Sequence, residues 1–123
     1  MKKRIMIIDD EIEILEMLEK FLKRSEKFEI DTFYEPKKGL SHLKSNNNYD
    51  LVLLDIMMPE LSGIDILTEI KKSNNNLKTI IMTAYSTMDR VINCKNLGAD
   101  DYVTKPFVSL RDIENKVLDN LGL

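Results

Sequence analysis

The sequence has 123 residues, 43% of them hydrophobic and 32% charged, with a formal net charge of −3. This length fits one domain over residues 1–123, and the composition excludes a chain that is disordered throughout. Lys and Arg are scattered among Asp and Glu, so no basic stripe predicts direct nucleic-acid binding. The apolar run behind Met1 is too short for a signal peptide or a membrane span. We therefore expect a cytoplasmic protein with no membrane contact, and the single Cys94 suits such a reducing compartment.

The first third of the chain alternates strand and helix patterns. Residues 4–8 form a β-branched apolar run, and apolar residues then recur at helical spacing as far as residue 22. Asp10, between the two patterns, is placed to cap the helix. Residues 28–33 alternate apolar and polar, which predicts an edge strand with one buried face, and Pro36 begins a short helix.

The central stretch organises the rest of the chain. An unbroken apolar run over residues 51–54 predicts a strand buried on both faces, and this run ends at Asp55. Pro59 forbids continuation of a central strand, and Ser62 can cap a new helix with Asp65 three residues further on. A strand that ends on a carboxylate and leads through a loop into a helix is where open α/β sheets bind ligands.

The second half repeats the alternation. Residues 77–82 predict a fourth strand, followed by a weaker helical pattern that Gly98 closes. Residues 101–103 predict a fifth strand, and Leu110 lies at the start of a terminal helix. Five strands that alternate with five helices predict a flavodoxin-like, three-layer α/β sandwich around a parallel sheet, for which we expect the strand order 2-1-3-4-5.

Chemically capable residues stand at the carboxyl ends of four predicted strands, which share one edge of a parallel sheet. Three carboxylates there would repel one another unless a cation neutralised them, and an all-oxygen site suits Mg²⁺. A lysine and a hydroxyl add the donors that a transferring phosphoryl group requires. Asp55 is then the candidate nucleophile. The full set is Asp9, Asp10, Asp55, Thr83 and Lys105.

Four pieces of the chain carry a resemblance to a known family, residues 7–10, 53–63, 81–84 and 98–107. Together they resemble a response-regulator receiver domain of the CheY-like type, and the resemblance covers essentially all of the chain. It implies that Asp55 accepts a phosphoryl group from a phosphohistidine on a histidine kinase or phosphotransfer protein. It also implies that the domain is no enzyme beyond its own phosphorylation and dephosphorylation.

The resemblance further implies a metal site and a signalling switch. Asp10, Asp55 and the Met57 carbonyl would hold Mg²⁺, for which Mn²⁺ can substitute, with Asp9 helping through water. Thr83 and Lys105 would bind phosphoryl oxygens, small Ala84 would leave the entry open, and the peptide between Lys105 and Pro106 would be cis. Thr83 and Tyr102 would move on phosphorylation and reshape the face made by the fourth helix, fifth strand and fifth helix. Met57 and Tyr85 would tune the lifetime of the phosphoryl group.

A docking site for the phosphodonor is a further expectation. Ile14 and Leu15, beside Pro106 and Phe107, are placed to dock a helical donor, with core packing as the equal alternative. We expect a monomer that can dimerise on phosphorylation, and the downstream effector or output domain is not readable from the residues.

Several alternatives stay open within and beside this interpretation. Residues 80–85 most resemble single-domain sporulation phosphorelay carriers, which favours a stand-alone carrier. The others are a chemotaxis-type regulator, the receiver half of a larger transcriptional regulator, and a pseudo-receiver that acts only by docking. A dehalogenase-type phosphatase would need an acid where Met57 stands. A flavodoxin-like flavin binder would need a phosphate loop where Glu11 follows two aspartates.

Overall fold

A computed structural model describes residues 2–46, 48–58, 61–73, 76–84 and 88–123. Pro59 and Tyr85, to which the sequence assigned a loop and a tuning role, lie outside these residues. Over the described chain, strands and helices alternate from one end to the other. The strands are β1 (Lys3–Ile8), β2 (Phe28–Phe33), β3 (Leu51–Asp55), β4 (Lys78–Thr83) and β5 (Asp101–Thr104). The helices are α1 (Ile12–Lys23), α2 (Pro36–Ser45), α3 (Gly63–Ser73), α4 (Met88–Asn96) and α5 (Leu110–Leu121).

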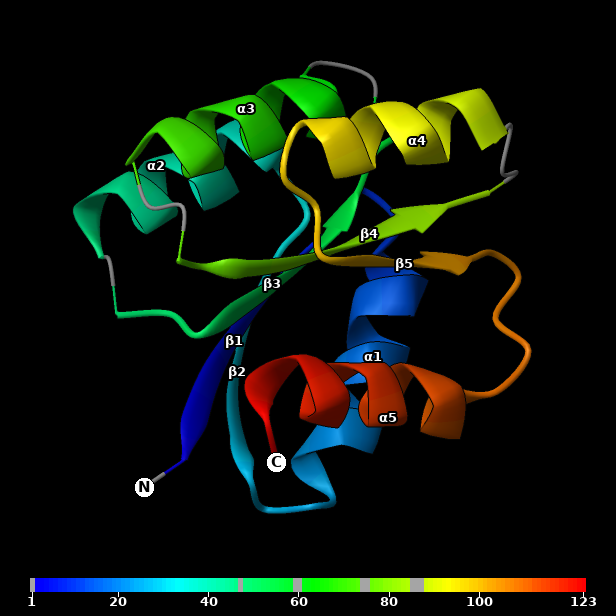
Figure 1. Ribbon diagram of the computed structural model, residues 1–123. Helices are drawn as coiled ribbons and strands as arrows, with labels where there is room; N and C mark the ends of the chain where they lie inside the picture. The colour runs from blue at the N-terminus through cyan, green and yellow to red at the C-terminus, as the bar shows by residue number, and fades with distance from the viewer. Residues whose placement is uncertain (1, 47, 59–60, 74–75, 85–87) are drawn as a thin grey trace.

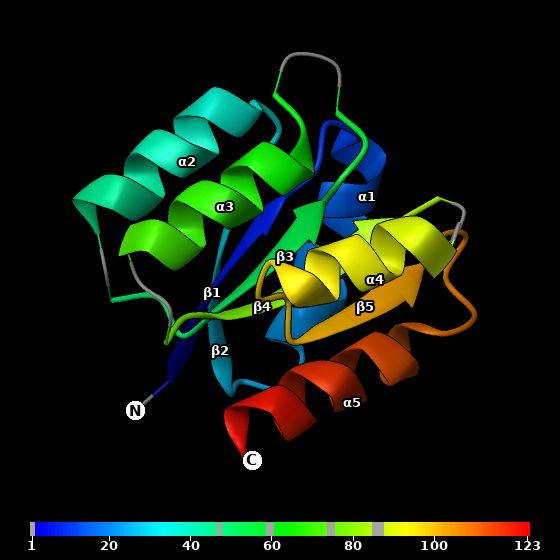
Figure 2. The same ribbon diagram turned by 45° about the horizontal axis from the view of Figure 1, so that its top comes forward.

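The strands form one parallel sheet in the order β2-β1-β3-β4-β5, as the sequence predicted. Helices α2, α3 and α4 cover one face of the sheet, and α1 and α5 cover the other (Figures 1 and 2). Strand β2 lies at an edge and pairs with β1 alone, which confirms the edge position expected from its alternating pattern. The fold is therefore the flavodoxin-like, three-layer sandwich.

Two apolar cores hold these layers together, one on each face of the sheet. Successive side chains of a strand point to opposite faces. Met6 and Ile8 of β1 therefore join the core beneath α2, α3 and α4, whereas Ile5 and Ile7 join the core beneath α1 and α5. Every residue of β3 is buried, because this strand has neighbours on both sides and helices on both faces.

The start of α1 differs from the prediction. Glu11, and not Asp10, occupies the N-cap position, and no side chain caps the helix there. Instead, the Asp9 carboxylate accepts a hydrogen bond of 2.9 Å from the Glu11 backbone N–H. The preceding aspartate thus forms the local turn, and the predicted Asp10 cap is wrong.

The start of α3 and the end of α4 follow the prediction. Ser62 Oγ accepts from the Asp65 backbone N–H at 3.2 Å and donates to the Asp65 carboxylate at 3.1 Å. Gly98 follows α4 with φ of +108°, a left-handed conformation in which glycine is favoured.

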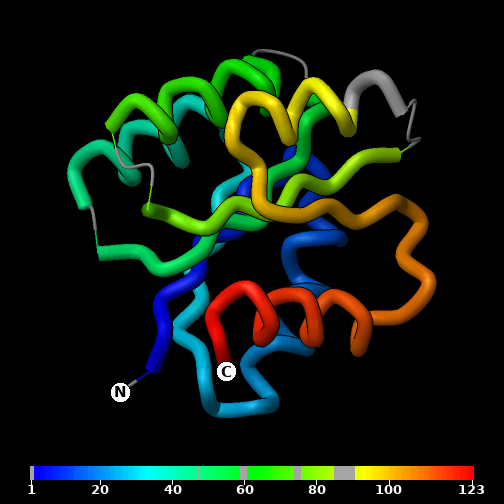
Figure 3. The backbone as a smooth tube through the Cα atoms, viewed as in Figure 1, coloured from blue at the N-terminus to red at the C-terminus, as the bar shows by residue number. Residues whose placement is uncertain are grey.

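Figure 3 traces the backbone and places both ends of the described chain at the same end of the domain. Lys2, Lys3 and Leu123 line one shared hollow there. In the described part of the chain, no helix combines the length and the apolar character needed to cross a bilayer.

Candidate functional site

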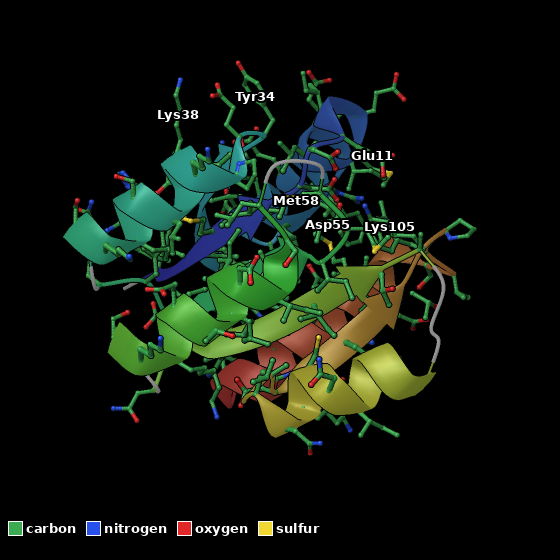
Figure 4. All side chains as sticks on the ribbon, turned by 90° about the horizontal axis from the view of Figure 1, so that it is seen from above. Glu11, Tyr34, Lys38, Asp55, Met58 and Lys105 are labelled. Atoms are coloured by element: carbon green, nitrogen blue, oxygen red, sulfur yellow. The ribbon has the colours of Figure 1, made fainter. Side chains whose placement is uncertain are left out.

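The carboxyl ends of the strands gather the predicted polar residues at one edge of the sheet. Asp9 directly follows β1, Asp55 ends β3, Thr83 ends β4 and Lys105 directly follows β5. Asp9 and Thr83 have no exposed surface, and Asp55 is 3% exposed. Figure 4 shows Asp55 beside Lys105 at this edge, with Glu11 close to them. The parallel topology thus brings together residues that are almost one hundred positions apart in the sequence.

Lys105 connects the acidic residues of this edge. Its Nζ donates to Asp9 Oδ2 at 2.6 Å and to Glu11 Oε1 at 3.2 Å, and it lies 3.5 Å from Asp55 Oδ2. The Lys105 backbone N–H donates to the Thr83 carbonyl oxygen at 2.7 Å, which fixes the start of its side chain against β4. The peptide bond between Lys105 and Pro106 is cis, as the resemblance implied.

The Asp55 carboxyl is poorly solvated and sits among other negative charges. The pKa of Asp55 is raised to about 7, because burial and the charge of Asp9 raise it by more than the Met57 N–H and Lys105 lower it. The Met57 backbone N–H donates to Asp55 Oδ1 at 3.1 Å, which leaves Oδ2 facing Lys105. The carboxyl therefore has one oxygen fixed by the backbone and the other directed into the acidic cluster.

The pKa values of Asp9 and Lys105, the two charged neighbours of Asp55, are also raised. Burial raises the pKa of Asp9, although its hydrogen bond with Lys105 opposes the rise. Burial alone would lower the pKa of Lys105, but the hydrogen bond and the charge of Asp9 outweigh it, so that this pKa is raised. The single ammonium group of Lys105 cannot neutralise the three carboxylates near it, so this edge of the sheet keeps a net negative charge.

A divalent cation of the Mg²⁺ type fits the donors at this edge. One carboxylate oxygen from each of four acidic residues lies within 4.8 Å of all the others. All of these ligands are oxygens, which Mg²⁺ prefers, and the charge of the cation would offset the negative excess. The four residues are Asp9, Asp10, Glu11 and Asp55.

Glu11 is the residue of this cluster that the sequence-based site did not include. Its signal in the sequence was its place directly after Asp9 and Asp10, where α1 begins. Nothing local shows that its side chain reaches Lys105, because that contact depends on how the ends of β1 and β5 lie in space.

Gly63, at the end of the matching piece 53–63, is a second residue to which the sequence assigned no role in the site. A Cβ atom at this position would lie 2.4 Å from the Asp55 carbonyl oxygen and 2.4 Å from Ile56 Cα. The Gly63 backbone N–H also donates to the Ile56 carbonyl oxygen at 3.3 Å. The first turn of α3 therefore rests directly on the backbone that carries Asp55, and only glycine permits this approach.

The remaining predicted residues lie around this cluster. Ala84 is exposed just beyond β4, and the Met57 side chain is 52% exposed. Tyr102 is half-buried on β5, where its ring packs against the core beneath α2, α3 and α4. The metal-binding role of the Met57 carbonyl and the switch roles of Thr83 and Tyr102 stay predictions.

An apolar groove of about 460 Å³ lies beside Lys105, where α1 meets the segment between β5 and α5. Ile14, Pro106 and Phe107, three of the residues predicted to dock a phosphodonor, line it, and their docking role stays a prediction. Leu15 does not line it, because this side chain is 4% exposed and belongs to the core beneath α1 and α5. For Leu15 the structure thus shows the core packing that the sequence analysis gave as the equal alternative.

The sequence of the chain matches the response regulator receiver domain family over residues 5–118. The transcriptional regulatory protein CpxR homolog of Haemophilus influenzae is 41% identical over 105 residues, which cover 85% of this chain and 44% of that protein. The chain thus spans less than half of the length of the curated relatives that it matches.

Solved structures agree in fold. A response regulator receiver domain protein from Clostridium thermocellum is 36% identical with a TM-score of 0.88, covering 98% of this chain and 94% of that one. A CheX–CheY–BeF3–Mg²⁺ complex from Borrelia burgdorferi is 28% identical with a TM-score of 0.87, covering 95% of this chain and 87% of that one. With the family match over most of the chain and the strand order described above, the chain belongs to the response regulator receiver domain family.

Proposed function

We propose that Asp55 of this receiver domain accepts a phosphoryl group from a phosphohistidine on a histidine kinase or phosphotransfer protein. The observation that carries the proposal is a buried carboxylate at the end of β3, with an ammonium group 3.5 Å away and further acids around it. An Asp55 oxygen attacks phosphorus, the bond from phosphorus to the histidine nitrogen breaks, and the leaving imidazole keeps that electron pair. The product is an aspartyl phosphate.

Asp10, Asp55 and the Met57 carbonyl would hold Mg²⁺, with Asp9 acting through water and Mn²⁺ able to substitute. When bound, the cation neutralises charge on the phosphoryl oxygens. The acidic cluster supports this assignment, as does the presence of BeF3 and Mg²⁺ in the Borrelia burgdorferi complex. Glu11 is not needed for the proposed ligand set.

The chain's own groups orient and stabilise the transferred phosphoryl group. The Met57 N–H fixes the rotation of the Asp55 carboxylate, and Lys105 supplies a cationic donor on the side of Oδ2. The Thr83 hydroxyl, at the end of the neighbouring strand, is the proposed second donor. Ala84 is small and exposed, which leaves room for the donor protein at the entry.

The output of the domain is proposed to be a change of shape on the face made by α4, β5 and α5. The phosphoryl group adds charge and acceptor oxygens, toward which Thr83 moves while Tyr102 reorients. Both a stand-alone carrier and the receiver half of a larger regulator can use such a face. We propose a cytoplasmic monomer that can dimerise on phosphorylation.

The donor is proposed to dock a helix in the groove beside Lys105. Its lining by Ile14, Pro106 and Phe107 supports this, because apolar grooves next to an active residue suit the apolar face of a helix. Lys105 itself lines the groove, so a donor seated there would hold its phosphohistidine near the acidic cluster.

Intact-mass measurement after incubation with acetyl phosphate tests the chemistry. The wild-type chain should gain one phosphoryl group in the presence of Mg²⁺ and none without it. Asp55→Asn should gain none, whereas Asp119→Asn, an exposed change on α5, should behave like the wild type. No gain by a folded wild-type protein under any condition would overturn the proposal in favour of a domain that acts only by docking.

A further inference from the structure

The Lys105 ammonium is shared unequally among its carboxylate neighbours. Its distances are 2.6 Å to Asp9, 3.2 Å to Glu11 and 3.5 Å to Asp55. The first two are hydrogen bonds, whereas the third exceeds the usual N–H···O range. Both hydrogen-bonded carboxylates come from the segment that joins β1 to α1. Lys105 therefore makes its hydrogen bonds on that side of the site, and a longer ion pair alone joins it to the proposed nucleophile.

Asp9 and Glu11 differ in how firmly they are placed. Asp9 is fully buried and is fixed by the Glu11 backbone N–H, so its carboxylate has little freedom. The Glu11 side chain is 60% exposed and does not cap α1. Its contact with Lys105 can therefore break without disturbing the helix or the core, whereas the contact of Asp9 cannot.

We propose that Glu11 is a positioning residue that retains Lys105 on the β1 side of the site while Asp55 is unmodified. Building on the proposed function, Glu11 then competes with a phosphoryl group on Asp55 for the same ammonium. Phosphorylation moves Lys105 toward the phosphoryl oxygens and breaks its hydrogen bond with Glu11. The hydrogen bond between Glu11 and Lys105 thus stabilises the unmodified form alone, and its loss disfavours the phosphorylated form by the same free energy.

Two substitutions separate this contact from a simple change of charge. Glu11→Gln removes the charge and keeps the length of the side chain. Glu11→Asp keeps the charge and shortens the side chain by one methylene, which withdraws it from Lys105. Glu13→Gln is the matched control, because Glu13 is an exposed acid in the first turn of α1 and makes the same change of charge two residues away.

Binding of beryllofluoride, a phosphoryl mimic, in the presence of Mg²⁺ measures the competition. Glu11→Gln and Glu11→Asp should each bind it about two- to fivefold more tightly than the wild type, the range expected for a partly exposed ion pair. Glu13→Gln should match the wild type. The opposite result would be that Glu11→Asp binds like the wild type while Glu11→Gln and Glu13→Gln both bind more tightly. The loss of a negative charge would then explain the tighter binding, and the proposal that the contact between Glu11 and Lys105 matters would be overturned.

A second measurement does not depend on phosphoryl chemistry. In crystal structures without a phosphoryl mimic, the Lys105 ammonium of Glu11→Gln should lie within hydrogen-bond distance of Asp55, about 3.2 Å or less. An unchanged lysine in that variant would overturn the inference. If the wild type bound no beryllofluoride, the proposed function would fail while the structural comparison still decided the role of Glu11. Weaker binding of Mg²⁺ alone by Glu11→Gln would instead make Glu11 a metal ligand.

Discussion

The Lys116 side chain of α5 contacts both the backbone and the ring of Tyr102 on β5. The Lys116 ammonium donates to the Tyr102 carbonyl oxygen at 2.5 Å and lies 5.0 Å from the centroid of the ring. It also donates to the Asp101 carboxylate at 3.3 Å, whose second oxygen accepts from Asn120 at 3.2 Å. The proposed switch residue is thus held in its present position by a cation on the neighbouring helix.

Replacement of Lys116 should release the Tyr102 ring. We expect Lys116→Met to lose about 0.5–1 kcal/mol of ring stabilisation, the value of a partly exposed cation–π contact, and so to shift the Tyr102 rotamer populations about two- to fivefold. Aromatic NMR resonances of Tyr102 in the unphosphorylated protein measure this shift. Lys116→Arg, which keeps a cation over the ring, should restore the wild-type spectrum, and identical spectra for all three proteins would contradict the prediction.

The raised pKa of Asp55, about 7, makes stability depend on pH. An unfolded aspartate titrates near pH 4, so between about pH 4 and 7 the folded protein binds the extra proton. The stability that this proton provides is present in full below about pH 4 and is lost as the pH rises through 7, by at most about 1.4 kcal/mol per pH unit.

Urea unfolding of metal-free protein at pH 5 and 7.5 checks this. Asp55→Asn cannot titrate, so its stability relative to the wild type should increase with pH. Asp119→Asn serves as the exposed control and should track the wild type. If the wild type and Asp55→Asn lost the same free energy of unfolding between pH 5 and 7.5, the pKa of Asp55 would lie near its ordinary value and the prediction would be wrong.

Enlargement of Gly63 should disturb both stability and chemistry. In Gly63→Ala the new methyl group meets backbone atoms at 2.4 Å, and backbone cannot move aside cheaply. We expect a loss of about 1–3 kcal/mol in the free energy of unfolding, together with slower phosphorylation of Asp55.

Gly39→Ala provides the comparison for that experiment. Its methyl group would lie 2.8 Å from the end of the Ile8 side chain, which can rotate away. The loss of stability measured by urea unfolding should therefore be smaller than for Gly63→Ala, and phosphorylation should be normal. Equal losses at the two glycines would mean that contact with the Asp55 backbone is not the cause.

A charge introduced into the proposed docking groove should slow phosphoryl transfer from a protein donor but not from a small-molecule donor. Val108 is 89% exposed and lines this groove, so Val108→Asp should fold normally. Loss of a well-placed apolar contact should slow transfer from a phosphorylated donor protein by about tenfold and leave labelling by acetyl phosphate unchanged. Ile92→Asp, on the exposed side of α4 at 51% exposure, is the control. Equal transfer rates in the two variants would place the docking surface elsewhere.

The fold and most of the site followed from local sequence patterns combined with one topological rule. An apolar run that ends on Asp55 predicts a buried strand, and a parallel sheet brings the ends of all strands to one edge. That rule was enough to place Asp9 and Lys105 near Asp55, and the observed contacts bear it out. It required no knowledge of individual side-chain conformations.

The sequence could not settle cases in which one side chain had to be chosen over its neighbour, and the predicted helix cap was wrong for this reason. Asp10 and Asp9 were equally suited to form the turn before α1, and the structure uses Asp9. Leu15 lies one helical turn before Leu18, so the period of α1 favours core packing, one of the two roles that the sequence left open for it. The contact between Glu11 and Lys105 spans 94 positions, and no local pattern encodes it.

The central place of β3 has a consequence for the rigidity of the backbone that carries Asp55. Each of its residues is buried and it pairs with β1 and β4, so its backbone amides should exchange with solvent only when the whole domain unfolds. The phosphoryl group proposed for Asp55 would therefore be attached to the slowest-opening part of the molecule. The face made by α4, β5 and α5, which is proposed to change shape, can therefore fluctuate many times while the backbone at Asp55 stays folded.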